Sequence, residues 1–162
     1  MNMARWVPDR VARLGILDAN PGIDDDARKA NRRRQIEDAS RIGVGELTRR
    51  ELADLYLAPA NRTERLIQIT VDMAEGHGLE TYKRQQTALM SRQSSLAGLS
   101  DYKGPSLVLC GELDVLCLPE WHRTMAEHLP DADLVIIPEA GHLATIEAPE
   151  AANAAILNWL QR

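Results

Sequence analysis

"PSLVLCGELD", residues 105–114, is one of two apolar runs that decide the fold, and the other is "ADLVIIPEAG", residues 132–141. Each is rich in Val, Leu and Ile and shows no polar alternation, which is typical of parallel strands covered on both faces. A third run, "VARLGIL" at residues 11–17, ends in a turn of sequence Asp-Ala-Asn-Pro-Gly and also predicts a buried strand.

Helical signals separate and follow the last two strands. Pro119 suits a first helical position, and Trp121, Met125 and Leu129 then recur on one face. Pro149 opens a second amphipathic stretch that runs to the end of the chain. Strand, helix, strand and helix in this order predict an α/β unit with right-handed crossovers.

Residues 24–98 differ from both flanks because they carry no strand signal. They are rich in Arg, Glu and Ala, and their spacing predicts helices throughout. Asp24 is expected to cap one helix, and Asn61 with Glu64 to begin another as a capping box. We therefore divide the chain into residues 1–23 with the end of a helix and the first core strand, a helical insertion at 24–98, and an α/β core at 99–162.

Composition excludes several classes of protein. The 162 residues carry a formal charge of −5 with 44% apolar and 27% charged residues, which argues against nucleic acid as a partner and for a globular chain. No stretch approaches a membrane span, no secretory signal is present, and two cysteines give no disulfide framework. We expect a cytoplasmic protein with neither a cofactor nor a metal.

Two residues that can carry chemistry follow the last two strands. Asp114 ends the run at 105–114, and His142 follows Gly141 after the run at 132–141. Functional groups of parallel sheets gather at the carboxyl ends of strands, so both side chains should meet there if the strands are neighbours. A carboxylate beside an imidazole fixes its tautomer and stabilises the imidazolium that forms when the ring takes a proton.

Residues 104–162 resemble the C-terminal end of the α/β-hydrolase fold superfamily. The matching features are a strand followed by Gly-x-x-Asp, a Pro and a helix, then a strand followed by Pro-x-Ala-Gly-His and a Glu-x-Pro helix start. The resemblance implies three parallel strands with flanking helices and an all-helical lid at 24–98. It further implies that Asp114 and His142 are the acid and base of a Ser-Asp-His triad, and that Leu66, Ile67 and Met73 on the lid line an apolar pocket for a small-molecule substrate.

The family's nucleophile precedes the acid in the chain, inside a Gly-x-Ser-x-Gly elbow, and the 162 residues contain no such sequence. The alternatives are weak: Ser100 lies in a loop, and Cys117 leaves the acid loop and should serve local packing. Glu112 is a reserve acid, and Glu139 and Glu147 are expected to be solvated or capping groups. His77, His122 and His128 are expected to be structural or exposed.

Two functions follow from this pattern. The first is a hydrolase of a small ester, lactone or related carbon compound whose nucleophile lies outside these residues. The second is an inactive, truncated relative that serves as a binding or oligomerisation module. In either case the strand near Val11–Leu17 would present an apolar sheet edge, so we expect self-association or pairing with an N-terminal hydrolase half.

Overall fold

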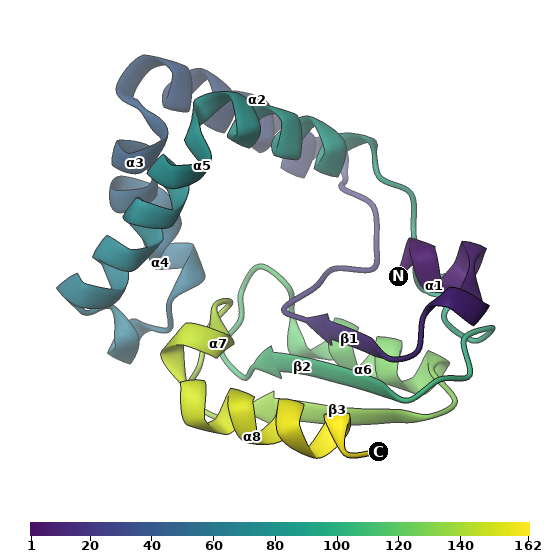
Figure 1. Cartoon of the computed structure of the whole chain (residues 1–162). Coiled ribbons are helices and arrows are strands. Elements are labelled where there is room, and N and C mark those ends of the chain that lie inside the picture. The colour runs from purple at the N-terminus through teal and green to yellow at the C-terminus, as the bar shows by residue number, and fades with distance from the viewer.

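The computed structural model describes the backbone of residues 1–162 and the side chains of all of them except Asn2 and Arg5. In this part of the chain a parallel sheet holds three strands in the order β1 (Leu14–Leu17), β2 (Ser106–Gly111) and β3 (Ala132–Ile137) (Figure 1). The predicted three-stranded parallel sheet is therefore confirmed. Strand β1 is shorter than the apolar run at residues 11–17 that predicted it, since residues 11–13 form a connection between β1 and a preceding 3-10 turn, η1 (Pro8–Arg10).

Helices cover both faces of the sheet, as the continuous apolar runs predict. All six residues of β2 are buried, and they alternate between two cores. Val108 packs in one core with Met125 of α6 (Pro119–His128), while Leu107 packs in the other with Ala152 near the start of α8 (Pro149–Leu160). Both helices begin at the prolines that the sequence indicated, since the missing amide hydrogen of proline is not needed in a first turn.

A large helical segment lies between β1 and β2 in the sequence and above the carboxyl ends of the strands in Figure 1. It has its own core, which includes Ala39, Leu47 and Tyr82. Its elements are α2 (Asp26–Ile42), α3 (Val44–Leu47), a π-helical stretch η2 (Thr48–Leu52), α4 (Ala53–Tyr56), η3 (Pro59–Asn61) and α5 (Glu64–Ser91). The helix α5 bends at Gly78, whose φ of 76° and ψ of 166° are not helical.

Both predicted helix caps are wrong by one or two residues. Asp25 caps α2 by accepting a hydrogen bond from the amide of Arg28 at 2.7 Å, whereas Asp24 is buried. Thr63 caps α5 by accepting from the amide of Leu66. Neighbouring polar residues can all cap a helix in principle, and the path of the chain decides which of them does.

The remaining elements are short: α1 (Asn2–Trp6), η4 (Leu96–Gly98) and α7 (Ala144–Glu147). Among the helices that the structure describes, none is both long enough and apolar enough to cross a membrane.

Strand β1 forms one edge of the described sheet. The amides of Leu14 and Asp18 donate to backbone carbonyls on the β2 side. Because backbone groups alternate along a strand, the amides of Gly15 and Leu17 face the opposite side. This edge corresponds to the one that the sequence predicted to pair with another chain, and that pairing stays a prediction.

Candidate active site

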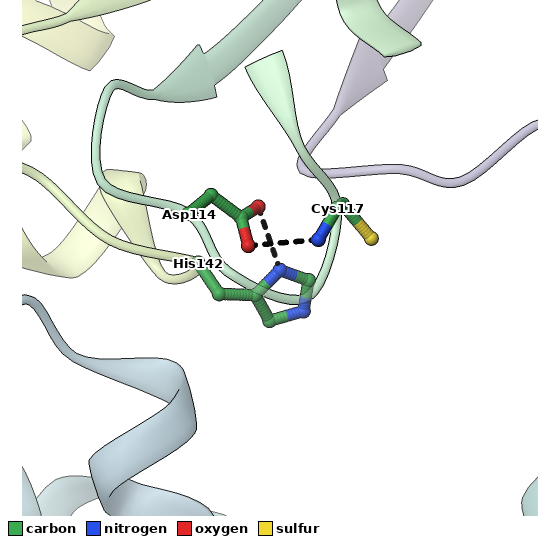
Figure 2. Close-up of side chains that lie close together, drawn as sticks. All are labelled: Asp114, Cys117 and His142. Carbon is green, nitrogen blue, oxygen red and sulfur yellow. Dashed lines mark hydrogen bonds and ion pairs between the residues drawn. The ribbon is translucent and has the colours of Figure 1, made fainter. Parts of the chain in front are cut away.

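Asp114 and His142 meet at the carboxyl ends of β2 and β3. Nδ1 of His142 lies 3.0 Å from Oδ2 of Asp114 and donates a hydrogen bond to it (Figure 2). The two residues are 28 positions apart in the sequence, and the adjacent parallel strands bring them together. The predicted contact between acid and histidine is therefore present.

The carboxylate of Asp114 is held in one orientation by its own loop. Its Oδ1 accepts hydrogen bonds from the amides of Leu116 and Cys117, both at 2.8 Å, which leaves Oδ2 for the histidine. The residue is only 2% exposed. Because buried carboxylate oxygens need such donors, the loop from Asp114 to Cys117 is built to hold this charged group beside His142.

This charge changes the protonation of His142. Burial by itself lowers the pKa of the ring, but the hydrogen bonds to Asp114 and Cys117 and the negative charge of Asp114 outweigh burial and raise the pKa of His142 above its usual value. Since the carboxylate can only accept, the proton stays on Nδ1, and Nε2 is the nitrogen left for chemistry. The arrangement therefore gives a strongly basic imidazole with a fixed tautomer.

The loop before His142 requires glycine because of close packing. A Cβ on Gly141 would lie 2.6 Å from the amide nitrogen of Ala58, and a Cβ on Gly111 would lie 2.1 Å from the carbonyl oxygen of Gly141. Glu139 has a positive φ of 57° in this loop, whereas Gly141 is not among the residues with positive φ. Gly141 thus serves the close approach of the helical segment.

Glu147 joins the histidine loop to the helical segment. Its Oε1 accepts from the amides of Gly141 at 2.9 Å and Leu143 at 3.3 Å, on either side of His142. Its Oε2 accepts from the amide of Ala58 at 2.8 Å and from Nδ2 of Asn61 at 3.0 Å. The prediction of a solvated or capping glutamate misses this role, because the partners of Glu147 lie up to 89 positions away.

Tyr56 of α4 provides a second link over the histidine. Its ring centroid lies 5.9 Å from that of His142, and its carbonyl oxygen accepts from the amide of Leu143 at 3.2 Å. Together with Glu147, Tyr56 places the helical segment directly against the imidazole.

His142 lines two neighbouring cavities. The smaller, about 250 Å³, is lined mostly by residues of the helical segment, among them Met73 and His77. The larger, about 620 Å³, extends towards β1 and includes Asp18 and Cys117. Of the three residues predicted to bind substrate, Met73 lines the smaller cavity, and Leu66 and Ile67 line neither of these two. The substrate-binding role of all three stays a prediction.

Cys117 lies closer to the site than its predicted packing role suggested. Ligand atoms of Asp114, Cys117 and His142 all lie within 4.8 Å of one another, so these residues could in principle hold a metal ion. However, both oxygens of Asp114 and Nδ1 of His142 are already engaged in hydrogen bonds with each other and with the loop. The set is thus arranged for a charge-supported imidazole.

Asp18, which follows β1, is a third polar residue at this rim that the sequence analysis missed. Its φ is 46°, a left-handed conformation that aspartate tolerates better than most residues. Burial raises its pKa to about 7, with opposing contributions from His142 and Asp114. Its Oδ1 is buried and has no hydrogen-bond partner among the described side chains and backbone. The signal that could have found it is its position after a strand, which it shares with Asp114 and His142.

The other candidate residues lie outside the acid–histidine pair. Glu112 accepts from the amide of Glu139 at 3.3 Å. His122 is fully buried, accepts at Nε2 from the amide of Ala19 and donates from Nδ1 to the carbonyl of Leu118, which confirms a structural role. His128 bonds the carbonyl of Thr124 within its own helix.

The chain is similar to a protein-family model and to longer proteins of known structure. Residues 83–162 match the family model described as TAP-like protein. An esterase from Thermogutta terrifontis is 30% identical and superposes with a TM-score of 0.87 over 98% of this chain and 58% of its own. The enol-lactonase from Burkholderia xenovorans LB400 is 19% identical, with a TM-score of 0.85 over 99% of this chain and 60% of its own, which supports the fold.

A curated relative matches the full length of the chain. The dihydrolipoyllysine-residue acetyltransferase component of the acetoin cleaving system from Pseudomonas putida is 26% identical over 100% of this chain and 42% of its own length. The chain thus spans between about two fifths and three fifths of the length of these three proteins.

Proposed function

The chain belongs to the α/β-hydrolase fold superfamily, and we propose that it supplies the acid and the base of a hydrolase that cleaves a small ester, lactone or related carbon compound. His142 is the general base and Asp114 the acid of a Ser-Asp-His triad. The nucleophile is a serine outside residues 1–162, in the part of the fold that the longer relatives possess in addition.

Each residue has a defined step. Nε2 of His142 takes the proton of the attacking hydroxyl, so that the oxygen adds to the substrate carbonyl. The imidazolium then returns the proton to the leaving oxygen. The neutral ring next activates a water molecule, which releases the carboxylic acid product from the serine. Asp114 keeps Nδ1 protonated and stabilises the positive ring in both stages.

The 3.0 Å hydrogen bond between His142 and Asp114, at the wall of two cavities, carries this proposal. Because the pKa of His142 is raised, the neutral base form becomes populated only as the pH rises. The rate of hydrolysis should accordingly increase with pH into the alkaline range. The apolar side of the smaller cavity, which Met73 lines, would receive the carbon skeleton of the substrate. The contacts of Leu66 and Ile67 with that skeleton are predicted from the sequence.

A fusion protein tests the proposal. The chain would follow the N-terminal part of the Thermogutta terrifontis esterase that it does not cover, and p-nitrophenyl acetate hydrolysis would be measured for the fusion, for the chain alone and for the His142→Ala and Asp114→Asn forms. We expect the chain alone to be inactive and the fusion to be active, with His142→Ala lowering kcat by at least about 10³-fold.

Two results would overturn the proposal. A fusion with a cooperative unfolding transition and a rate that His142→Ala leaves unchanged would remove His142 from the chemistry. A folded fusion that does not hydrolyse the ester would favour the inactive module instead.

A further inference from the structure

Three arginine side chains line the larger cavity together with His142. Arg28 and Arg32 lie on α2 and Arg92 follows α5, and these two long helices pack against each other above the sheet (Figure 1). The cavity therefore has a basic wall that faces the same space as the imidazole, although the chain as a whole carries a charge of −5.

The positive charge of this wall is only partly neutralised. Asp24 is 1% exposed and pairs with Arg32 at 2.5 Å and with Arg92 at 3.0 Å. Burial opposes its ionisation, but the hydrogen bond from Arg32 and the charges of the arginines outweigh burial and lower the pKa of Asp24. One ionised carboxylate thus serves two guanidinium groups.

Arg28 adds a third guanidinium group, which takes no part in the ion pairs of Asp24 with Arg32 and Arg92. Its Cζ lies 5.0 Å from the ring centroid of Trp121, an arrangement that orients the group without neutralising it. The half-buried side chain of Arg28 contributes to the same cavity wall. Three guanidinium groups and a single firmly ionised carboxylate leave an excess of positive charge here.

Arg92 also keeps a donor without an acceptor. Its Nε is buried and has no hydrogen-bond partner among the described residues, although its Nη2 binds Asp24. A buried donor without a partner is costly, and a planar anion is the group that a guanidinium fork matches best.

We propose that the larger cavity binds the free carboxylate of the substrate, so that the compound cleaved is a small acid ester or lactone acid. Arg28 and Arg92 contact the carboxylate, and the scissile carbonyl extends towards Nε2 of His142. This inference rests on the proposed function for the reaction, but the binding site itself needs no nucleophile.

Asp18 gives the site an opposing charge. It lines the cavity with the arginines and follows the strand beside the acid–histidine pair. An ionised Asp18 repels a bound carboxylate, and replacement by asparagine removes that repulsion while keeping the shape of the side chain. We therefore expect Asp18→Asn to bind a carboxylate more tightly, and variants that lose an arginine of the wall to bind it less tightly.

Titration of the full chain by calorimetry tests the site with two matched probes, monomethyl succinate and the neutral dimethyl succinate. We expect the acid ester to bind at least about tenfold more tightly, since a charge-assisted hydrogen bond is worth about one order of magnitude in affinity or more. Arg28→Gln and Arg92→Gln should each remove about this factor, and Asp18→Asn should tighten binding.

Arg50→Gln is the control, because Arg50 is an exposed arginine of the same helical segment that pairs with Glu46 and does not line the larger cavity. Equal affinity for the two esters, or Arg28→Gln binding as the unchanged chain does, would overturn the inference. Tighter binding of inorganic phosphate than of monomethyl succinate would also overturn the carboxylate assignment. Binding with the expected pattern beside an inactive fusion would refute the hydrolase proposal alone.

Discussion

Replacing Glu147 with alanine tests whether one carboxylate holds the histidine loop against the helical segment. The change removes the acceptor for three amides and one side-chain amide, those of Gly141, Leu143, Ala58 and Asn61. Charge-assisted hydrogen bonds are worth about 1.5–3 kcal/mol each when well buried. Because Glu147 is half-buried and such losses are not additive, we expect the free energy of unfolding to fall by about 2–4 kcal/mol in total.

Urea unfolding followed by circular dichroism measures this loss, read as a lower midpoint at an unchanged slope. Hydrogen exchange then locates it: the amides of Gly141, Leu143 and Ala58 should lose protection before those of β2. The unfolding free energy of Glu147→Gln should lie between those of the unchanged chain and Glu147→Ala, because the carboxamide keeps one acceptor oxygen and turns an NH₂ group towards the other donors.

Glu127→Ala is the matched control, since Glu127 is exposed on α6, and it should change the unfolding free energy by no more than about 0.5 kcal/mol. An unchanged urea midpoint in Glu147→Ala, together with unchanged hydrogen exchange at Gly141, would refute the idea that Glu147 holds the histidine loop against the helical segment.

Three further predictions concern the base, the core and the sheet edge. In Asp114→Asn the pKa of His142, followed by NMR of its ring protons, should fall, because burial remains and the hydrogen bond and charge of the carboxylate are gone; a pKa that stays as high as in the unchanged chain would contradict this. Because the pKa of His142 is raised in the folded chain, the stabilisation by the Asp114–His142 pair is complete below about pH 6.5 and is lost as the pH rises through the folded pKa. The unchanged chain and Asp114→Asn should therefore converge in unfolding free energy at alkaline pH. Met125→Ala empties a fully buried position and should lower the unfolding free energy by about 2–5 kcal/mol in urea titrations, and a loss under 1 kcal/mol would mean that the core collapses onto the gap. Gly15→Pro removes an amide that faces away from β2 and should reduce the mass measured by light scattering; a clean monomer before the substitution would show that the edge does not drive association.

The strands and the acid–histidine pair could be predicted because their signals are local. A buried parallel strand needs a continuous apolar run, and functional groups follow its carboxyl end, so Asp114 and His142 could be placed at one rim from residues near them in the sequence. The contact between them then follows from the pairing of β2 with β3.

Other parts of the site depend on segments that approach only in the folded chain. The partners of Glu147 lie as far away as Ala58, and the arginine wall exists because Asp24 meets Arg92 across 68 positions. In the run Arg32-Arg33-Arg34 on α2, Arg32 turns inward to Asp24 and Gln86. Periodicity reports which face of a helix is apolar and is silent on which polar residues that face meets.

The bend at Gly78 helps to determine the shape of the larger cavity beside the imidazole of His142. A straight helix of the 28 residues of α5 would extend about 42 Å, and its second half would continue in the direction of the first. The left-handed backbone of one residue redirects that half so that Gln86 reaches Arg32 at 2.7 Å and Arg92 reaches Asp24. The size and polarity of the compound that fits beside His142 are thereby determined partly by a residue that has no side chain and takes no part in the reaction.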